Sequence, residues 1–168
     1  MNGTGTLREQ TINWMSRDKW QYYLTLNFNR SVPKWKATNA FGEFCQRLDR
    51  QLLGPKYAKY SDRRVLIWGI PEHIRSNIHF HSLMKIDQII EFSKLTNVVG
   101  KSWTSVVSSG TTDLQKIYDV RPLVRYMTKE FVKPNHFDRI VFSEDFWPPD
   151  ENYRAPKNLH NKQLLPWA

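Results

Sequence analysis

Two histidines on a predicted β-strand are the side chains of this sequence best suited to chemistry. His79 and His81 flank Phe80 in the run NIHFHSL at residues 77–83. Because alternate side chains of a strand share a face, the two imidazoles point to one side of the strand and Phe80 points to the other. Imidazole is a common metal ligand, so the pair predicts a metal site.

A metal bound by two imidazoles needs a further protein ligand and open positions for a substrate. Glu72 is the first candidate, because a hairpin between strands expected at 65–70 and 77–86 would return its carboxylate to the histidines. His73 is a second candidate for this ligand, and Asp87 is a third. Mixed nitrogen and oxygen ligands suit Mg²⁺, Mn²⁺ or Zn²⁺ and do not choose among them.

A tyrosine and a lysine three positions apart form a second group of interest. Tyr126 and Lys129 fall on a helix expected over 121–132, where this spacing places them on one face. A tyrosine hydroxyl can attack a phosphodiester and become covalently linked to the phosphate. A neutral phenol is a weak nucleophile, so we expect a metal at the phosphate and the lysine ammonium to assist it.

The composition favours a polyanionic partner. The 168 residues carry a net charge of +9, with a pI near 9.7, and include 7 Trp, 7 Tyr and 9 Phe. Lysine and arginine can follow the phosphates of a nucleic acid while aromatic rings stack on its bases. Cys45 is the only cysteine, which excludes an internal disulfide and a cysteine zinc site.

The chain shows no apolar run of membrane-spanning length and no secretory signal at its N-terminus. We therefore expect no membrane partner and no secretion. The expected location is the cytoplasm of a bacterial or archaeal cell, or the nucleic-acid compartment of a host cell.

Hydrophobic periodicity predicts short strands that alternate with helices. Helices are expected over 7–19, 36–53, 87–103 and 121–132, and strands over 20–28, 65–70, 77–86, 114–118 and 139–142. Asp87 is expected to cap its helix. This order predicts an α+β fold, with a mainly antiparallel sheet, helices packed on it and the histidine strand in the centre. Residues 1–144 are expected to form one domain and 145–168 a proline-rich C-terminal tail, packed or partly disordered.

Three motifs in order resemble those of the HUH single-strand DNA endonucleases of the replication-initiator (Rep) class. They are YLTLN at 23–27, HFH at 79–81 and YMTK at 126–129. Glu72 resembles the acidic ligand upstream of the family's histidine strand. The resemblance covers about residues 20–142 and implies a ferredoxin-like (RRM-like) HUH fold.

The resemblance also implies a reaction. Tyr126, assisted by Lys129, attacks a phosphodiester of single-stranded DNA and leaves a 5′-phosphotyrosine and a free 3′-OH. Mg²⁺ or Mn²⁺, bound by His79, His81 and Glu72, polarises the phosphate. A polymerase extends the 3′-OH, and a later 3′-OH attack rejoins the strand. The expected function is therefore a site-specific nickase that initiates rolling-circle replication of a plasmid, phage or satellite element.

The expected partners are single-stranded DNA or an origin hairpin, with a host or separate helicase and polymerase. The chain has no Gly-x-x-x-x-Gly-Lys-Ser/Thr phosphate loop, so we expect it to use a separate helicase or to act on DNA that is already single-stranded. A single-tyrosine transposase and a stand-alone nickase that attacks a competing genome are alternatives with the same chemistry. A non-catalytic nucleic-acid-binding module is the alternative of another class.

Six further side chains are candidates for contacts with DNA: Thr25, Asn27, Tyr57, Tyr60, Arg121 and Arg125. The first two belong to the expected first strand, and the two tyrosines to a basic loop at 56–64, where they could stack on bases. The two arginines lie near the expected nucleophile and could contact phosphate. A purely structural or surface role is the alternative for each of the six.

Overall fold

The computed structural model describes residues 3–147, which form two compact units. A sheet unit comprises residues 20–117 and 140–147, and a helical unit comprises residues 3–19 and 118–139. The expected C-terminal tail lies outside the described residues from residue 148 onward.

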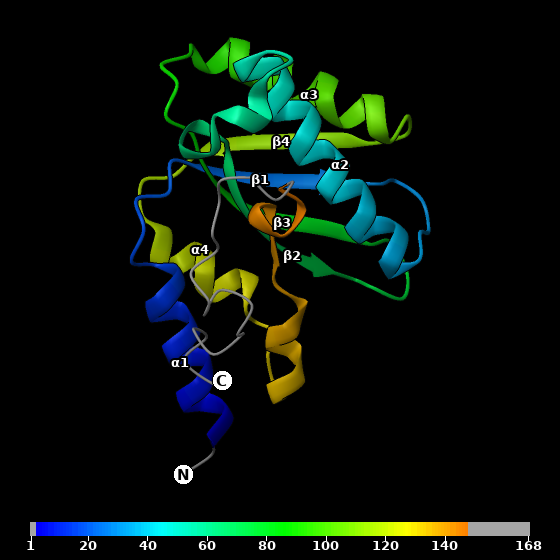
Figure 1. The fold of residues 1–168 in the computed structure, drawn as a ribbon. Helices are drawn as coiled ribbons and strands as arrows, with labels where there is room; N and C mark the ends of the chain where they lie inside the picture. Colours follow the sequence, from blue (N-terminus) through cyan, green and yellow to red (C-terminus); the bar gives the residue numbers. More distant parts are fainter. Residues whose placement is uncertain (1–2, 148–168) are drawn as a thin grey trace. The chain divides into compact units, whose positions relative to one another are not determined.

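The sheet unit is built on five antiparallel strands in the order β4-β1-β3-β2-β5 (Figure 1). The strands are β1 (Tyr22–Asn27), β2 (Leu66–Glu72), β3 (His79–Lys85), β4 (Thr111–Lys116) and β5 (Val141–Phe142). The histidine strand β3 is central, as predicted, and pairs with β1 on one side and β2 on the other. The α+β class is confirmed, and the arrangement is consistent with a ferredoxin-like fold.

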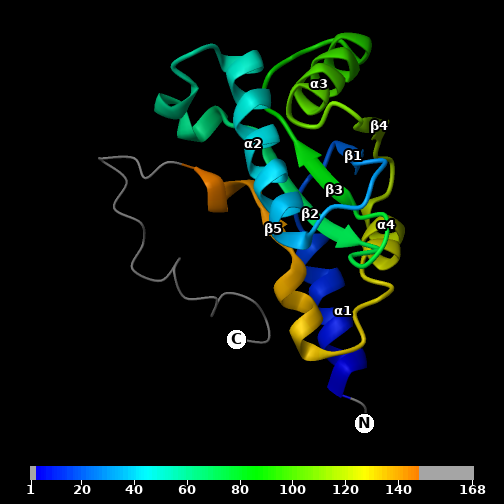
Figure 2. The ribbon, with the colours of Figure 1, turned by 90° about the vertical axis from the view of Figure 1, so that its right-hand side faces the viewer.

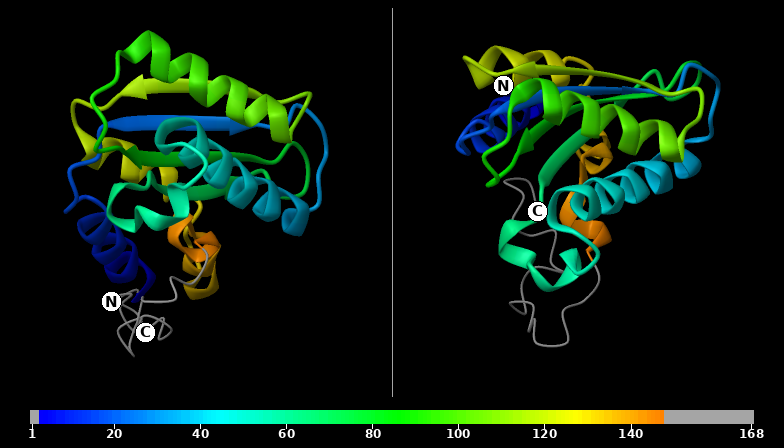
Figure 3. Two further views of the ribbon diagram at one scale, coloured as in Figure 1. Left: turned by 45° about the horizontal axis from the view of Figure 1, so that its top comes forward. Right: turned by 90° about the horizontal axis from the view of Figure 1, so that it is seen from above.

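Two helices, α2 (Lys34–Leu53) and α3 (Phe92–Val106), cover one face of the sheet (Figure 3). Phe80 of β3 points to this covered face, where its ring centroid lies 4.8 Å from that of Phe41 on α2. The same core contains Trp103 of α3 and the fully buried Cys45. Burial raises the pKa of the Cys45 thiol, so it remains neutral and serves packing. Because Phe80 faces the helices, the histidines on either side of it face away from them.

Strand β2 continues through Glu72, whereas the sequence predicted a connection over 71–76. Figure 2 shows the short strand β5 beside β2. Pro71 is tolerated because β5 pairs only with Trp68 and Gly69, so β2 has no strand neighbour on that side at Pro71. Gly69 lies under α2, and a Cβ atom there would be 2.7 Å from the Phe41 ring. The continuation of β2 matters because it places Glu72 on a strand rather than in a loop.

A buried ion pair joins the end of α2 to the start of β2. The Arg64 Nε atom donates to Asp49 Oδ2 at 2.7 Å, and both side chains are only 1% exposed. The backbone N–H of Val65 donates to Asp49 Oδ1 at 2.8 Å. Asp49 therefore fixes where β2 enters the sheet.

The helical unit contains α1 (Gly3–Met15), α4 (Val120–Met127) and a 3₁₀ helix at Pro134–Arg139. Glu9 of α1 pairs with Arg125 of α4 at 2.7 Å and with Arg121 at 3.4 Å. The Arg121 guanidinium also donates to Asn13 Oδ1 at 2.8 Å. These contacts hold α1 against α4.

Three of the predicted helices have boundaries that are wrong by several residues. Helix α1 spans Gly3–Met15 instead of 7–19. Helix α3 begins at Phe92 after Glu91, not at Asp87, because the Phe92 ring stacks on Tyr22 while Ile89 remains fully exposed. Helix α4 ends at Met127 rather than at residue 132. The Thr128 hydroxyl donates to the Val124 carbonyl at 2.8 Å at this end of the helix.

No helix among the described residues is long and apolar enough to span a membrane.

Replacing Asp49 with alanine is expected to lower the free energy of unfolding by about 3–5 kcal/mol, because Arg64 would remain buried without its partner. Denaturant unfolding followed by circular dichroism measures this loss. Glu43→Ala is the matched control: it removes an exposed ion pair with Arg47 in the same helix and should cost less than about 1 kcal/mol. Equal losses in the two variants would contradict the role of Asp49.

Burial raises the pKa of the Glu144 carboxyl, although Trp68 Nε1 and the Ser143 hydroxyl donate hydrogen bonds to it. The folded protein therefore retains this proton to a higher pH than the unfolded chain. The stability that the carboxyl contributes is fully present below its ordinary pKa and is lost as the pH rises through the raised pKa.

In Glu144→Gln this pH-dependent loss should disappear. The unfolding free energy of the variant relative to wild type should rise between the ordinary and the raised pKa of the carboxyl and level off above it. Denaturant titrations from acidic to neutral pH measure the difference. A difference that stays constant over this range would show that the carboxyl titrates alike in both states.

Candidate metal centre

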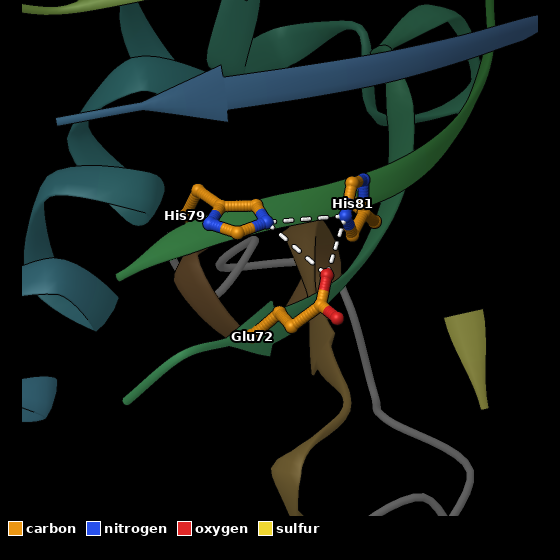
Figure 4. Close-up of side chains that lie close together, drawn as sticks. All are labelled: Glu72, His79 and His81. Carbon is orange, nitrogen blue, oxygen red and sulfur yellow. Dashed lines mark hydrogen bonds and ion pairs between the residues drawn. The ribbon is translucent and has the colours of Figure 1, made fainter. Parts of the chain in front are cut away.

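Three side chains converge on the face of the sheet that α2 and α3 do not cover (Figure 4). Glu72, the last residue of β2, lies directly opposite His79, the first residue of β3, and His81 follows on the same face. Glu72 Oε2 lies 3.2 Å from His79 Nε2 and 2.7 Å from His81 Nε2. The two Nε2 atoms are 3.2 Å apart. One carboxylate oxygen and two imidazole nitrogens thus form a small triangle.

This triangle has the size that a single metal ion requires. Ligand atoms bound at about 2.1 Å and at right angles to one another lie about 3 Å apart. The observed sides of 2.7, 3.2 and 3.2 Å match that spacing. Three ligands on one triangular face leave the opposite side of the ion for substrate and water. The Glu72, His79 and His81 cluster can therefore hold a metal ion and keep open positions on it.

The cluster is largely shielded from solvent. The Glu72 side chain is 8% exposed, and those of His79 and His81 are 16% and 12% exposed. A carboxylate at this depth needs hydrogen bonds or a cation to offset its lost hydration. The two imidazoles supply hydrogen bonds, and a bound metal would supply the cation.

Of the three candidates for the further ligand, the structure brings only Glu72 to the histidines. His73 begins the turn after β2 with a φ of 52°, and its side chain is 57% exposed. Its Nε2 atom lies 3.9 Å from Glu72 Oε1, and its ring stands beside that of His79. Asp87 follows the opposite end of β3 and is exposed. Neither His73 nor Asp87 is part of the metal-binding group found among the described residues.

The second nitrogen of each imidazole has a partner that orients the ring. His79 Nδ1 lies 3.1 Å from the Asn77 carbonyl, which can only accept, and in the tautomer with the proton on Nδ1 the Nε2 atom keeps the lone pair that binding a metal would require. His81 Nδ1 lies 2.6 Å from the Tyr23 hydroxyl of β1, and the two rings stack with an interplanar angle of 11°. The tyrosine hydroxyl can accept from Nδ1–H when Nε2 binds a metal, or donate to Nδ1 otherwise. Such outer contacts strengthen metal binding.

Tyr23 is the residue of this site that sequence reasoning missed. In the sequence it is recognisable only as the first residue of the YLTLN motif. The pairing of β1 with β3 could have identified it, because in this register the Tyr23 side chain lies on the same face of the sheet as the two histidines. Thr25 lies opposite His81 with its hydroxyl 3.4 Å from Nδ1, and Asn27 lies opposite His79. Both therefore border the cluster.

The nucleophile motif lies in the helical unit. Tyr126 is near the end of α4 and 48% exposed. Lys129 lies in the turn that follows the helix, where its backbone N–H donates to the Tyr126 carbonyl at 3.1 Å. Its Nζ atom is 3.8 Å from the centroid of the Tyr126 ring. The lysine thus accompanies the tyrosine as predicted, although through a turn and not along a helix.

The remaining candidates for DNA contacts fall into two groups. Tyr57 lies in a 3₁₀ turn before β2 and Tyr60 between that turn and the next, at the end of the strand opposite Glu72. The seven-residue strand separates them from the carboxylate by about 20 Å. Arg121 and Arg125 pair with Glu9 within the helical unit. None of the four belongs to the metal-binding cluster.

Comparison of the chain with protein-family models, with curated proteins and with solved structures finds no match.

Replacing Tyr23 with phenylalanine is expected to weaken Mn²⁺ binding by about 10- to 100-fold, because His81 loses the partner that orients its ring. Isothermal titration calorimetry measures the affinity. Tyr22→Phe is the matched control, since Tyr22 directly precedes Tyr23 in β1 and stacks on Phe92 on the covered face. If both variants bind Mn²⁺ as wild type does, Tyr23 has no part in the site.

Proposed function

We propose that the protein is a metal-dependent, site-specific single-strand DNA nickase of the HUH type, which initiates rolling-circle replication of a plasmid, phage or satellite element. The observation that carries the proposal is the convergence of Glu72, His79 and His81 beside a central antiparallel strand, on the face of the sheet that α2 and α3 do not cover. The same chain carries a Tyr-x-x-Lys motif with the lysine ammonium against the tyrosine ring.

The proposed ion is Mg²⁺ or Mn²⁺. Two imidazoles and one carboxylate leave open positions, and a phosphodiester offers hard oxygen ligands of the kind that both ions prefer. When bound, the ion would draw charge from the scissile phosphate and so favour attack at phosphorus. Tyr23 and the Asn77 carbonyl would hold the imidazoles in the orientation that binding requires.

In the proposed reaction, the Tyr126 hydroxyl oxygen forms a bond to the phosphorus of single-stranded DNA. The bond between phosphorus and the 3′ oxygen breaks. The phenolic proton is lost, and the leaving 3′ oxygen takes up a proton as it becomes a 3′-OH. The bond energy is conserved in the 5′-phosphotyrosine, so attack by a 3′-OH can reverse the step and rejoin a strand. Lys129 places a positive charge beside the Tyr126 ring, where it would favour approach of the anionic phosphodiester.

The proposal extends to the other components of replication. A free 3′-OH is a primer for a polymerase, and a separate helicase would expose the single strand. Single-tyrosine transposition and attack on a competing genome use the same chemistry, so the DNA substrate distinguishes them from replication.

The test is formation of a covalent adduct with a labelled single-stranded DNA library in the presence of Mn²⁺. Wild-type protein should form an adduct that survives denaturing electrophoresis and maps by mass spectrometry to Tyr126. Tyr126→Phe should form none and should still bind DNA, because only the phenolic oxygen is removed. Tyr118→Phe is the matched control and should keep full activity, although this tyrosine is 96% exposed.

His81→Ala should also abolish the adduct, because one of three metal ligands is lost. Tight DNA binding by wild type without an adduct under any divalent metal would instead indicate a nucleic-acid-binding module. An adduct that persists in Tyr126→Phe would show that another residue is the nucleophile.

A further inference from the structure

One exposed tryptophan stands out in the sheet unit. Trp35, in the first turn of α2, is 62% exposed, whereas the other tryptophans of the described chain are buried or half-buried. The Lys36 ammonium lies 5.3 Å from the centroid of its ring. The flat apolar ring of Trp35, with its polar N–H, is therefore accessible for stacking on a ligand.

The connections at the end of the sheet near Trp35 carry positively charged side chains and no acidic ones. Three connections leave the sheet at one end, on the right in Figure 1: residues 28–33 after β1, 73–78 between β2 and β3, and 107–110 before β4. Together with the first turn of α2 they contain four exposed cations and no aspartate or glutamate. The cations are Arg30, Lys34, Lys36 and Arg75. We call these four residues and Trp35 the cationic end of the sheet.

These charges are not balanced within the described chain. None of the four cations forms an ion pair with another described residue. Lys34 and Lys36 also lie at the positive end of the α2 dipole, which has no acidic residue in its first turn. The connections at the other end of the sheet are mixed, because Asp62, Asp87 and Glu91 accompany their lysines and arginines.

The cationic end adjoins the metal-binding cluster. Asn27, the last residue of β1, pairs with His79, and His79 pairs with Glu72. The connection after β1 and the turn after β2 therefore start from the row of residues that holds two of the metal ligands. Arg75 lies within that turn, between Glu72 and His79 in sequence.

We propose that the cationic end binds the segment of single-stranded DNA that flanks the scissile phosphate, with a base stacked on Trp35 and phosphates at the four cations. The inference rests on the proposed nickase function for the identity of its ligand. An exposed indole ring can stack on an unpaired base but not on one inside a duplex. A membrane surface suits the site less well, because no apolar helix face accompanies the single tryptophan.

Fluorescence anisotropy with a labelled oligothymidylate, in EDTA so that no cleavage occurs, tests the inference. Trp35→Ala should weaken binding by about 5- to 150-fold, since stacking of a base on an aromatic ring contributes about 1–3 kcal/mol. Trp35→Phe should restore part of the affinity because it retains a ring. Thermal unfolding checks that both variants remain folded.

The salt dependence of DNA binding measures separately how much the four cations contribute to the affinity. Changing Lys34 and Lys36 together to glutamine should make the slope of log K against log salt shallower by about 0.7 for each lost phosphate contact. The matched control changes Lys56 and Lys59 together to glutamine. These lysines lie beside the 3₁₀ turn at the other end of the sheet, and their loss should leave the slope unchanged.

The outcomes separate this inference from the nickase proposal. Wild-type affinity and slope in the Trp35 and lysine variants would overturn the inference, even if wild type forms the Tyr126 adduct. Weakened binding in those variants would support it, and an accompanying absence of any adduct would reject only the nickase. Binding to anionic vesicles that Trp35→Ala abolishes, with no effect on oligothymidylate, would also overturn it.

Discussion

The register between β2 and β3 is the constraint on which the candidate metal centre depends. Glu72 lies opposite His79, so both side chains point to the same face of the sheet. A slip of one residue would turn the carboxylate toward the helices and leave the imidazoles without it. The covered face fixes this register, because Phe80 must reach Phe41, and Gly69 is the residue that fits beneath the same ring. The hydrophobic core thus sets the position of the metal ligands, although it shares no side chain with them.

The two faces of the sheet differ in the side chains that they carry. The face under α2 and α3 buries large apolar side chains and supplies the stability. The other face carries Tyr23, Thr25 and the metal-binding cluster, all at low exposure and in contact with one another. Polar groups at this depth need mutual hydrogen bonds, and the cross-strand rows provide them. The connections at the nearby end of the strands bury Phe28, Ile78 and Val107 in the hydrophobic core and carry their charges on other, exposed residues.

The helical unit depends on contacts between its two α-helices. Its two helices are short, and α4 alone would be marginal in water at eight residues. Glu9 of α1 pairs with Arg121 and Arg125, so two arginines that are candidates for phosphate contacts in the sequence hold α4 to α1. The same contacts support the segment that carries Tyr126. The N-terminal residues of the chain therefore belong structurally with residues more than a hundred positions later.

The sequence by itself determined the element types, the antiparallel α+β fold and the central place of the histidine strand. These depend on hydrophobic periodicity, which is local. It also predicted Glu72, His79 and His81 as a group, because strand alternation and a short hairpin suffice to bring them together. Only the tertiary structure chose Glu72 over His73, since that required β2 to continue past Pro71 at a position without a strand neighbour. It alone joined Tyr23 to His81, ended α4 before Lys129 and left Trp35 exposed, because packing between distant segments decides each of these.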